Sequence, residues 1–167
     1  MLKTLAKTVA VVFLLASFFS ISGCRKQPVQ PPKQVTEDIY PEPAAANAEI
    51  QNALATAARE YKRVILDFGG NWCGDCKVLN IYYHQEPNAS LLAANYVLVD
   101  VNICRMDCNT DIADKYAVPL KKGVPALAVL DSNGTLLYSQ RNGEFESMRR
   151  MDSNSVTDFL NTWKPKG

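Results

Sequence analysis

Two cysteines separated by two residues, Cys73 and Cys76, carry the clearest chemical signal in this 167-residue chain. They lie in the stretch Gly-Gly-Asn-Trp-Cys-Gly-Asp-Cys-Lys, residues 69–77. Such a pair can bind zinc, close a structural disulfide or exchange disulfides reversibly. A structural zinc site normally needs four ligands. The chain has five cysteines and one histidine, and zinc shared between two cysteine pairs would lack the usual ligand spacing.

The place of the pair in the chain favours redox chemistry. A disulfide across two residues closes a very small loop and stabilises a fold little through chain entropy. The apolar run 63–68 ends at two glycines, and we expect a helix to begin at the cysteines. Unpaired amides and the positive end of the helix dipole would favour the Cys73 thiolate, the form that attacks disulfides. Cys76, one turn further on, would then attack the mixed disulfide and release the product.

The elements that position this pair follow from hydrophobic periodicity and turn signals. Asn47 is the expected cap of the first helix, and Ser153 or Ser155 that of the last. The expected elements, in order, are helix 47–61, strand 63–68, helix 73–84, a helical turn 90–95, strand 96–101, helix 110–116, strands 124–130 and 135–139, and a closing helix to 163. The first two strands should be parallel and the last two antiparallel, giving an α/β fold with a mixed sheet between helices.

The first 24 residues have the parts of an export signal. Two lysines precede an apolar run of about 13 residues, which is short for a membrane-spanning helix. The residues Ile21 to Cys24 then read Ile-Ser-Gly-Cys, which resembles the lipobox of bacterial lipoproteins. The resemblance implies a signal peptide over 1–23, a lipid on Cys24 and a place in the bacterial cell envelope. An ordinary signal peptide that contains a cysteine is the alternative.

The composition divides the remainder into a tether and one domain. Residues 24–46, the lipidated cysteine and a proline-rich stretch, cannot build a core and predict a semi-rigid tether. Residues 47–167 are enough for one compact domain. Arg25, rather than aspartate, follows Cys24, which by the bacterial sorting rule points to the outer membrane over the inner one. Eighteen basic and 17 acidic residues leave the chain near neutral, without the basic footprint of nucleic-acid binding.

Two motifs resemble the thioredoxin family. Leu66-Asp67-Phe68 followed by the segment Trp72 to Lys77 resembles the active-site segment of thioredoxins, and Gly123-Val124-Pro125 resembles their cis-proline loop. Lys115-Tyr116 and Asn133-Gly134 match in order, so the likeness covers about residues 47–164. It implies a thioredoxin fold with a four- to five-stranded mixed sheet flanked by helices. It also implies thiol–disulfide oxidoreductase activity without a bound organic cofactor or metal.

The resemblance further assigns a role to each matched residue. Cys73 would be the nucleophile, Cys76 the resolving thiol, and Asp67 the buried carboxylate that moves protons for the resolving thiol. For Asp67 the alternative is a strand-end aspartate that caps the next turn, and for Trp72 an ordinary core aromatic. The substrate-binding surface would comprise Trp72, Gly74, Asp75, Val124 and Pro125.

Asp75 departs from the family pattern, because thioredoxins have proline between their cysteines. A carboxylate about 6 Å from the Cys73 sulfur disfavours the thiolate and would lower the reduction potential by roughly 15–60 mV. Lys77 offsets part of this effect. We therefore expect a reductase-like couple rather than a strongly oxidising one.

A second cysteine pair, Cys104 and Cys108, follows the second expected strand. In an oxidising compartment a disulfide between them is the default, and its spacing fits a loop better than a helix. Two alternatives remain open: soft sulfur ligation of Cu(I) with the intervening Met106, or an auxiliary redox pair.

The expected partners follow from the envelope location. Disulfide-containing exported proteins would be the substrates, and a membrane-embedded thiol donor would supply electrons. The lipid would hold the domain at a membrane, in the periplasm. The competing class is a non-enzymatic thioredoxin-fold module, such as a copper metallochaperone or an envelope scaffold.

Overall fold

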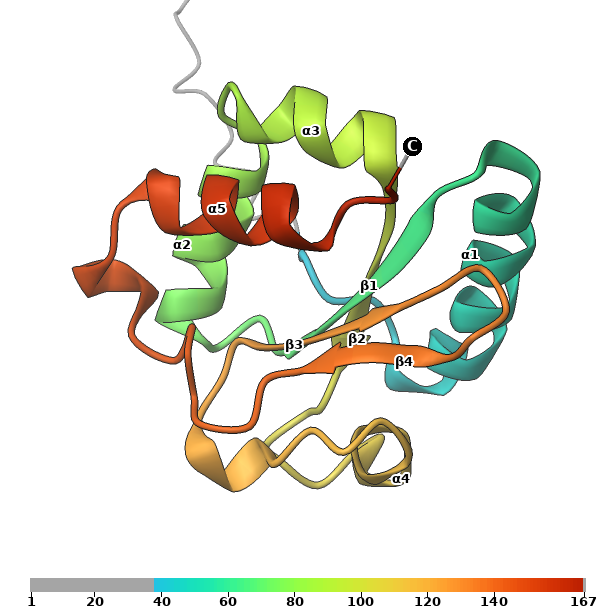
Figure 1. Cartoon of the computed structure of the whole chain (residues 1–167). Coiled ribbons are helices and arrows are strands. Elements are labelled where there is room, and N and C mark those ends of the chain that lie inside the picture. The colour runs from blue at the N-terminus through green and yellow to red at the C-terminus, as the bar shows by residue number, and fades with distance from the viewer. Residues whose placement is uncertain (1–37, 167) are drawn as a thin grey trace, which may run out of the picture. The chain divides into compact units, whose positions relative to one another are not determined.

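The computed structural model describes residues 38–166, which contain a four-stranded sheet (Figure 1). The strand order is β2-β1-β3-β4, with β1 at Arg63–Gly69, β2 at Tyr96–Asn102, β3 at Ala126–Leu130 and β4 at Leu136–Ser139. β1 pairs with β2 in parallel and with β3 antiparallel, and β4 is antiparallel to β3. The predicted α/β fold and its mixed sheet are confirmed.

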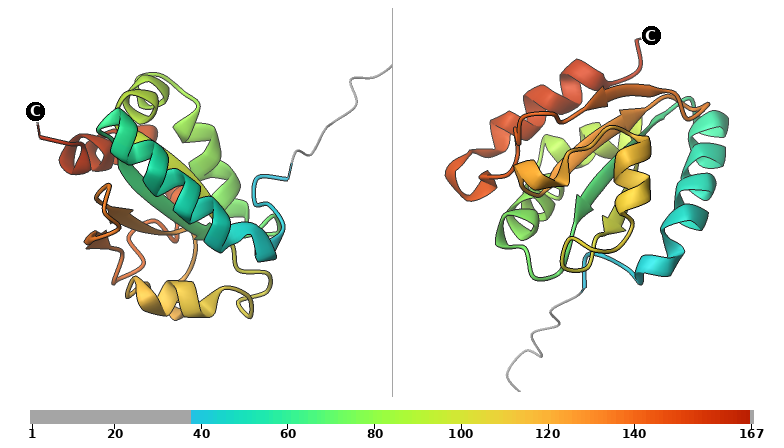
Figure 2. Two further views of the ribbon diagram at one scale, coloured as in Figure 1. Left: turned by 90° about the vertical axis from the view of Figure 1, so that its right-hand side faces the viewer. Right: turned by 90° about the horizontal axis from the view of Figure 1, so that it is seen from below.

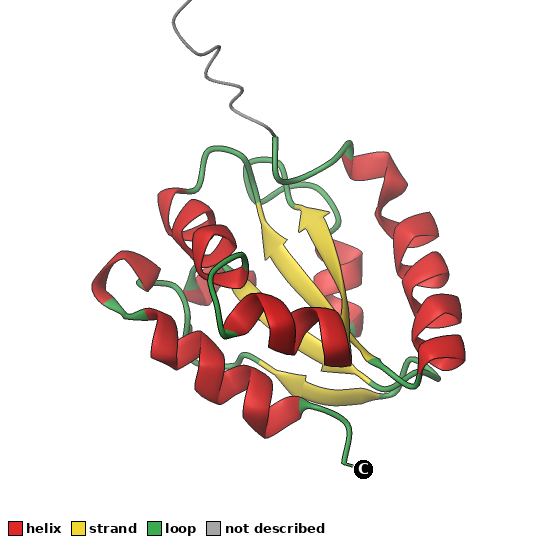
Figure 3. Ribbon diagram, turned by 90° about the horizontal axis from the view of Figure 1, so that it is seen from above, coloured by secondary structure: helices red, strands yellow, loops and turns green. Residues whose placement is uncertain are grey.

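Helices cover both faces of this sheet (Figures 2 and 3). One face packs against α1 (Ala46–Glu60) and α4 (Thr110–Lys115). The other packs against α2 (Gly74–Tyr83), α3 (Asn88–Asn95) and α5 (Ser153–Trp163). Three short 3₁₀ turns, η1 to η3, lie at Pro43–Ala45, Leu120–Lys122 and Met148–Arg150. Among residues 38–166, none of the helices has the length and apolar character needed to cross a bilayer.

Side-chain alternation along β1 builds the two halves of the core. Val64, Leu66 and Phe68 pack in the cluster on the α1 face, and Ile65 packs in the cluster on the α2 face. By the same alternation Asp67 follows Ile65 on the α2 face, and it is a buried charged residue, only 2 % exposed. A carboxylate in this position is expensive to ionise, so its surroundings matter for function.

Both predicted helix caps are wrong. Asn47 lies inside α1, whose N-cap is Ala45 without a side-chain bond, because the Pro43–Ala45 turn leads directly into the helix. At α5 the cap is Asp152 rather than either serine, and its carboxylate accepts a hydrogen bond of 2.9 Å from the amide of Asn154. An aspartate one residue earlier satisfies the first free amides equally well.

The stretch from residue 38 to residue 46, assigned to the tether by composition, is part of the domain. Tyr40 is 2 % exposed and packs in the core. Three asparagine side chains bind the backbone here. The amide of Tyr40 donates to Asn71 at 3.0 Å, Asn71 donates back to the Tyr40 carbonyl at 3.0 Å, and Asn102 and Asn109 donate to the carbonyls of Pro41 and Pro43. The predicted signal peptide and Cys24 lie outside the described residues.

Candidate active site

Cys73 and Cys76 form a disulfide at the corner between β1 and α2, with an S–S distance of 2.14 Å. Cys73 is the N-cap of α2, and the Cys76 amide donates to its sulfur at 3.1 Å. Cys76 is fully buried, and Cys73 is slightly exposed. On reduction, this amide and the helix dipole stabilise negative charge on the Cys73 sulfur. The outer sulfur is therefore the one prepared for attack.

The second predicted motif lies against the first. The peptide bond between Val124 and Pro125 is cis, and the Cys73 sulfur is 3.6 Å from the Val124 carbonyl oxygen, although 51 positions separate the two residues. The buried side chain of Gln140, beyond β4, holds this loop, because it donates to the Pro125 carbonyl at 3.0 Å and accepts from the Leu127 amide at 3.2 Å. Gln140 was not predicted, since its role depends on a pairing across the sheet.

Trp72 is partly exposed, at 42 %, beside the cysteine pair, which excludes the core-aromatic alternative. Its indole nitrogen donates to the carbonyl of Cys104, and the Arg105 guanidinium lies 5.6 Å from the centre of its ring. The structure joins Cys104 and Cys108 by a disulfide, with an S–S distance of 2.06 Å. The second cysteine pair thus belongs to the loop that supports Trp72.

The same loop contains the residues that the copper-binding alternative requires. The ligand atoms of Cys104, Asp107 and Cys108 all lie within 4.8 Å of one another. Thiolates, not disulfide sulfurs, are the form that binds soft metals. Metal binding here would therefore require reduction of the disulfide first.

Asp75 forms an ion pair that the sequence did not predict. Its carboxylate accepts from the backbone amide of Arg149 at 2.9 Å and pairs with the Arg149 guanidinium, also at 2.9 Å. Partial burial raises the pKa of the Asp75 carboxyl, but the bonds and charge of Arg149 outweigh it, and the pKa lies below its ordinary value. Arg149, not Lys77, is therefore the main counter-charge, and the potential should fall less than an isolated carboxylate predicts.

Replacing Arg149 with methionine should make the couple more reducing, because the Asp75 charge would then act on the Cys73 sulfur without its counter-ion. We expect the reduction potential to fall by roughly 15–60 mV, measured by equilibration with glutathione. Arg150→Met is the matched control, because Arg150 is exposed, makes none of the hydrogen bonds that Arg149 makes to Asp75, and acts on it by charge only, with the smallest influence on the Asp75 pKa. Equal falls in both variants would contradict a specific role for the ion pair.

Asp67 is buried and hydrogen-bonded, which argues against the turn-capping alternative. The Tyr40 hydroxyl donates to its Oδ1 at 3.1 Å. Its register partner on β2 is Asp100, a second carboxylate. Burial first, and then the Asp100 charge, raise the pKa of Asp67 well above the ordinary value. Its surroundings therefore favour protonation of Asp67 relative to an ordinary aspartate.

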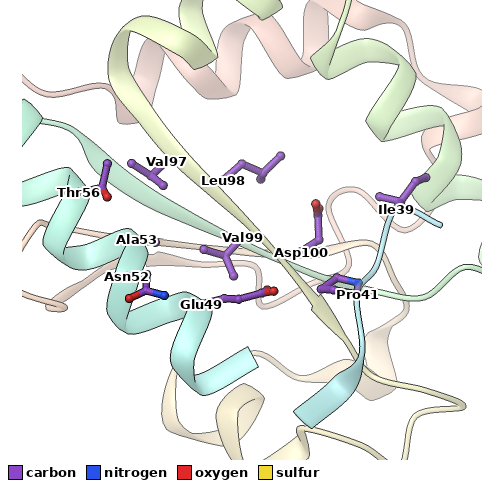
Figure 4. Close-up of a pocket in the computed structure, with 10 residues that line it drawn as sticks. All are labelled: Ile39, Pro41, Glu49, Asn52, Ala53, Thr56, Val97, Leu98, Val99 and Asp100. Carbon is purple, nitrogen blue, oxygen red and sulfur yellow. The ribbon is translucent and has the colours of Figure 1, made fainter. Parts of the chain in front are cut away.

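Asp100 was not predicted as a site residue, although an aspartate inside an apolar strand is a readable signal. Burial, and next the charge of Glu49, raise its pKa to about 7, and His84 acts in the opposite direction. Figure 4 shows Asp100 on β2 at a surface pocket, between Glu49 of α1 and the segment that carries Ile39 and Pro41. Water can reach Asp100 through this pocket.

These features define a class: a thioredoxin-type fold that carries a disulfide at the start of α2, beside a cis-proline loop. A profile described as thioredoxin-like matches residues 45–132. A solved structure described as a disulphide isomerase from Xylella fastidiosa Temecula1 is 31% identical in sequence, with a TM-score of 0.71. That match covers 74% of this chain and 95% of the solved one. The chain belongs to the thioredoxin-like family, as the sequence predicted.

The curated relatives that match this chain are named for thiol–disulfide exchange. The thiol:disulfide interchange protein DsbD of Pseudomonas fluorescens is 32% identical over 123 residues, and that of Vibrio cholerae is 29% identical over 103. The matches cover 70% and 62% of this chain but only 18% and 17% of those proteins, so the chain spans less than a fifth of their length. Family and site together identify the chain as a thiol:disulfide oxidoreductase, which confirms the predicted activity class.

Proposed function

We propose that the chain reduces disulfides of exported proteins through the Cys73 and Cys76 dithiol. The observation that carries this proposal is the position of the Cys73 sulfur. It accepts a hydrogen bond from the Cys76 amide at the start of α2 and lies 3.6 Å from the Val124 carbonyl oxygen. The Cys73 thiolate attacks a substrate disulfide and forms a mixed disulfide, and one substrate sulfur leaves as a thiolate. The Cys76 thiolate then attacks Cys73, releases the second substrate thiol, and leaves the disulfide that the structure contains.

The surface around Cys73 suits an extended polypeptide. Trp72 and Gly74 flank the nucleophile and are exposed, and the Val124 backbone lies beside the sulfur. An extended substrate segment would pair with the Val124 backbone as an added strand. Pro125 and Asp75 would border the same segment on two sides. We therefore propose the substrate-binding surface that the sequence predicts, formed by Trp72, Gly74, Asp75, Val124 and Pro125.

We also propose which kind of donor supplies the electrons and in which compartment the domain acts. A membrane-embedded thiol donor would reduce the Cys73–Cys76 disulfide after each turnover, since the curated relatives are thiol:disulfide interchange proteins. The domain would act in the periplasm, with Cys24 lipidated and the outer membrane favoured. Support for the anchor comes from the Ile-Ser-Gly-Cys motif alone.

A trapping experiment tests this function. The Cys76→Ser chain, produced in bacteria, should accumulate mixed disulfides with exported proteins, because the resolving thiolate is missing. The Cys73→Ser, Cys76→Ser double variant is the control and should trap nothing. In vitro, wild type but not Cys73→Ser should accelerate insulin reduction by dithiothreitol. A metallochaperone, the competing class, would instead bind copper stoichiometrically and trap no partner.

The same cells test the anchor. Trapped complexes should sediment with membranes when Cys24 is present, and Cys24→Ser should release them into the soluble fraction. Soluble complexes in both cases would refute lipidation and leave the catalytic proposal untouched.

A further inference from the structure

The hydroxyl of Tyr40 contacts the Asp67 carboxylate and borders the space beside Gly69 that the Cys76 sulfur also borders. It donates to Asp67 Oδ1 at 3.1 Å. A Cβ added to Gly69 would overlap this hydroxyl and would lie 2.8 Å from the Cys76 sulfur, so a single carbon would meet both groups. A side chain at position 69 would therefore displace the phenol, the sulfur or both. The oxygen of Tyr40 thus bonds to Asp67 and shares with the Cys76 sulfur the small space beside Gly69.

The backbone of Tyr40 is fixed to the loop that carries the nucleophile. Asn71 makes two hydrogen bonds with it, one to the amide and one to the carbonyl, both of 3.0 Å. Asn71 immediately precedes Trp72 and Cys73 in the chain. The phenol is thus positioned relative to the active-site loop by a bidentate contact, rather than by packing alone.

We propose that Tyr40 relays the proton between Cys76 and Asp67 during resolution of the mixed disulfide. This inference rests on the roles proposed above for Cys73 and Cys76. Tyr40 lies outside the thioredoxin motifs, in a segment whose composition predicted a tether. The structure therefore adds the end of that segment to the reaction machinery.

In the mixed disulfide, Cys76 carries S–H and Asp67 is a carboxylate that accepts the Tyr40 hydroxyl. The Cys76 proton moves to the Tyr40 oxygen while the Tyr40 proton moves to Asp67 Oδ1. The Cys76 thiolate then attacks the Cys73 sulfur, a new S–S bond forms, and the bond to the substrate sulfur breaks. The substrate leaves as a thiolate, and Asp67 keeps the proton.

The electrostatic surroundings keep the Tyr40 phenol neutral and make the Asp67 carboxylate easier to protonate. Burial first, and then the Asp67 charge, raise the pKa of Tyr40 well above 10.0, so the phenol stays protonated between transfers. Asp67 faces Asp100 from β2 and Tyr40 from the first described segment, and burial and Asp100 raise its pKa. The other titratable groups around this cluster are Tyr83 and His84 at the end of α2 and Glu49 of α1.

Solvent reaches the cluster on the Asp100 side. The pocket that Asp100 lines has a volume of about 430 Å³ and is bounded by Glu49, Ile39 and Pro41 (Figure 4). Its walls therefore include the residues on either side of Tyr40. A proton left on Asp67 after turnover has a neighbouring carboxylate in contact with water, to which it can be returned.

Stopped-flow kinetics of the full-length protein in detergent test the relay. Reduced protein is mixed with saturating glutathione disulfide, so that the plateau rate of release of the second glutathione reports the attack by Cys76. We expect Tyr40→Phe, which removes only the hydroxyl, to slow this rate at pH 7 by about tenfold or more. The deficit should narrow towards pH 9, where more of the Cys76 thiol ionises without help. A change below about twofold, or an equal loss at every pH, would overturn the relay.

A double-variant cycle gives a second readout. If both residues act in one transfer, Tyr40→Phe combined with Asp67→Asn should be no slower than Asp67→Asn alone. Multiplicative losses would overturn the proposal. Tyr96→Phe is the matched control, since it removes a buried phenol that donates to the Leu160 carbonyl at 2.6 Å, and its resolution rate should equal that of wild type.

Failure of the relay and failure of the proposed function give different results. A wild-type chain that releases no second glutathione would refute the dithiol mechanism and the relay together. A wild-type chain that releases it normally, with Tyr40→Phe at the same rate, would refute the relay alone. Melting temperatures of the four variants (Tyr40→Phe, Asp67→Asn, their combination and Tyr96→Phe), measured alongside, must remain above the assay temperature.

Discussion

The Asp100→Asn variant should be more stable than the wild-type chain at pH 8, and this gain should disappear near pH 4. Asp100 pairs in register with Asp67, so two carboxylates lie side by side on the neighbouring strands β1 and β2. Burial, and next the charge of Glu49, raise the pKa of Asp100 to about 7. An amide of the same shape removes the cost of ionising a partly buried acid beside another.

The direction in which stability changes with pH follows from proton linkage. Because the folded-state pKa of Asp100 lies above the unfolded value, the folded state binds more protons between about pH 4 and pH 7. Wild-type stability is therefore lost as the pH rises through that window. One pKa unit is about 1.4 kcal/mol, and the open pocket lets water lower the cost, so we expect a gain of about 2–4 kcal/mol at pH 8.

Urea unfolding of both chains from pH 4 to pH 8 measures this gain. Asp158→Asn, an exposed aspartate of α5, is the matched control and should change stability little at any pH. A wild-type stability that stays flat between pH 4 and pH 8 would show that the carboxylate pair carries no such cost. Loss of stability in Asp100→Asn at pH 8 would show that the charge is needed.

The sequence predicted those parts of the site that consist of short contiguous motifs. The cysteine pair and the Val124–Pro125 loop are contiguous motifs, and the strand and helix that hold Cys73 follow from an apolar run and two glycines. Their approach across 51 positions follows from the fold once β3 pairs with β1. Local pattern and topology were sufficient for these residues.

The residues that the sequence did not predict have side chains that reach the site from remote segments. Arg149 comes from a turn 74 positions after Asp75, and nothing near Asp75 in the sequence indicates it. Tyr40 lies among prolines, and composition predicted a tether because proline-rich segments rarely build a core. The sequence signal for this packing was a large aromatic residue with three asparagines further along the chain, each able to bind the backbone. Such hydrogen bonds follow no periodic pattern, so they could not be predicted from the sequence.

Removing the second disulfide should weaken reaction with polypeptides and leave reaction with small disulfides intact. In the loop that the disulfide closes, Cys104 and Met106 have left-handed backbone, with φ of 52 and 75°, and so has Asn109 directly after it, with φ of 53°. Such conformations are strained for residues with a side chain, and the cross-link helps to hold them. Without it the loop can relax, and the Cys104 carbonyl that accepts from Trp72 would move.

For the Cys104→Ala, Cys108→Ala variant we expect a loss of roughly 2 kcal/mol in unfolding free energy, the value for a loop this short. Insulin reduction should slow several-fold through a higher KM, because a mobile Trp72 must be ordered again when a polypeptide docks. The reaction with glutathione disulfide, which offers no extended polypeptide strand to dock on this surface, should keep its rate. Comparing the two substrates on one preparation separates docking from thiol chemistry.

Arg105→Met is the matched control, because it removes the cation over the Trp72 ring and leaves the disulfide and the Cys104 carbonyl in place. Its effect on the KM for insulin should be smaller than that of the double variant, since an exposed cation–π contact is worth only about 0.5–1 kcal/mol. Equal losses with insulin and with glutathione disulfide would mean that the loop supports the Cys73 chemistry itself. The docking role of Trp72 would then be wrong, because a support for the surface alone cannot slow a substrate that does not touch it.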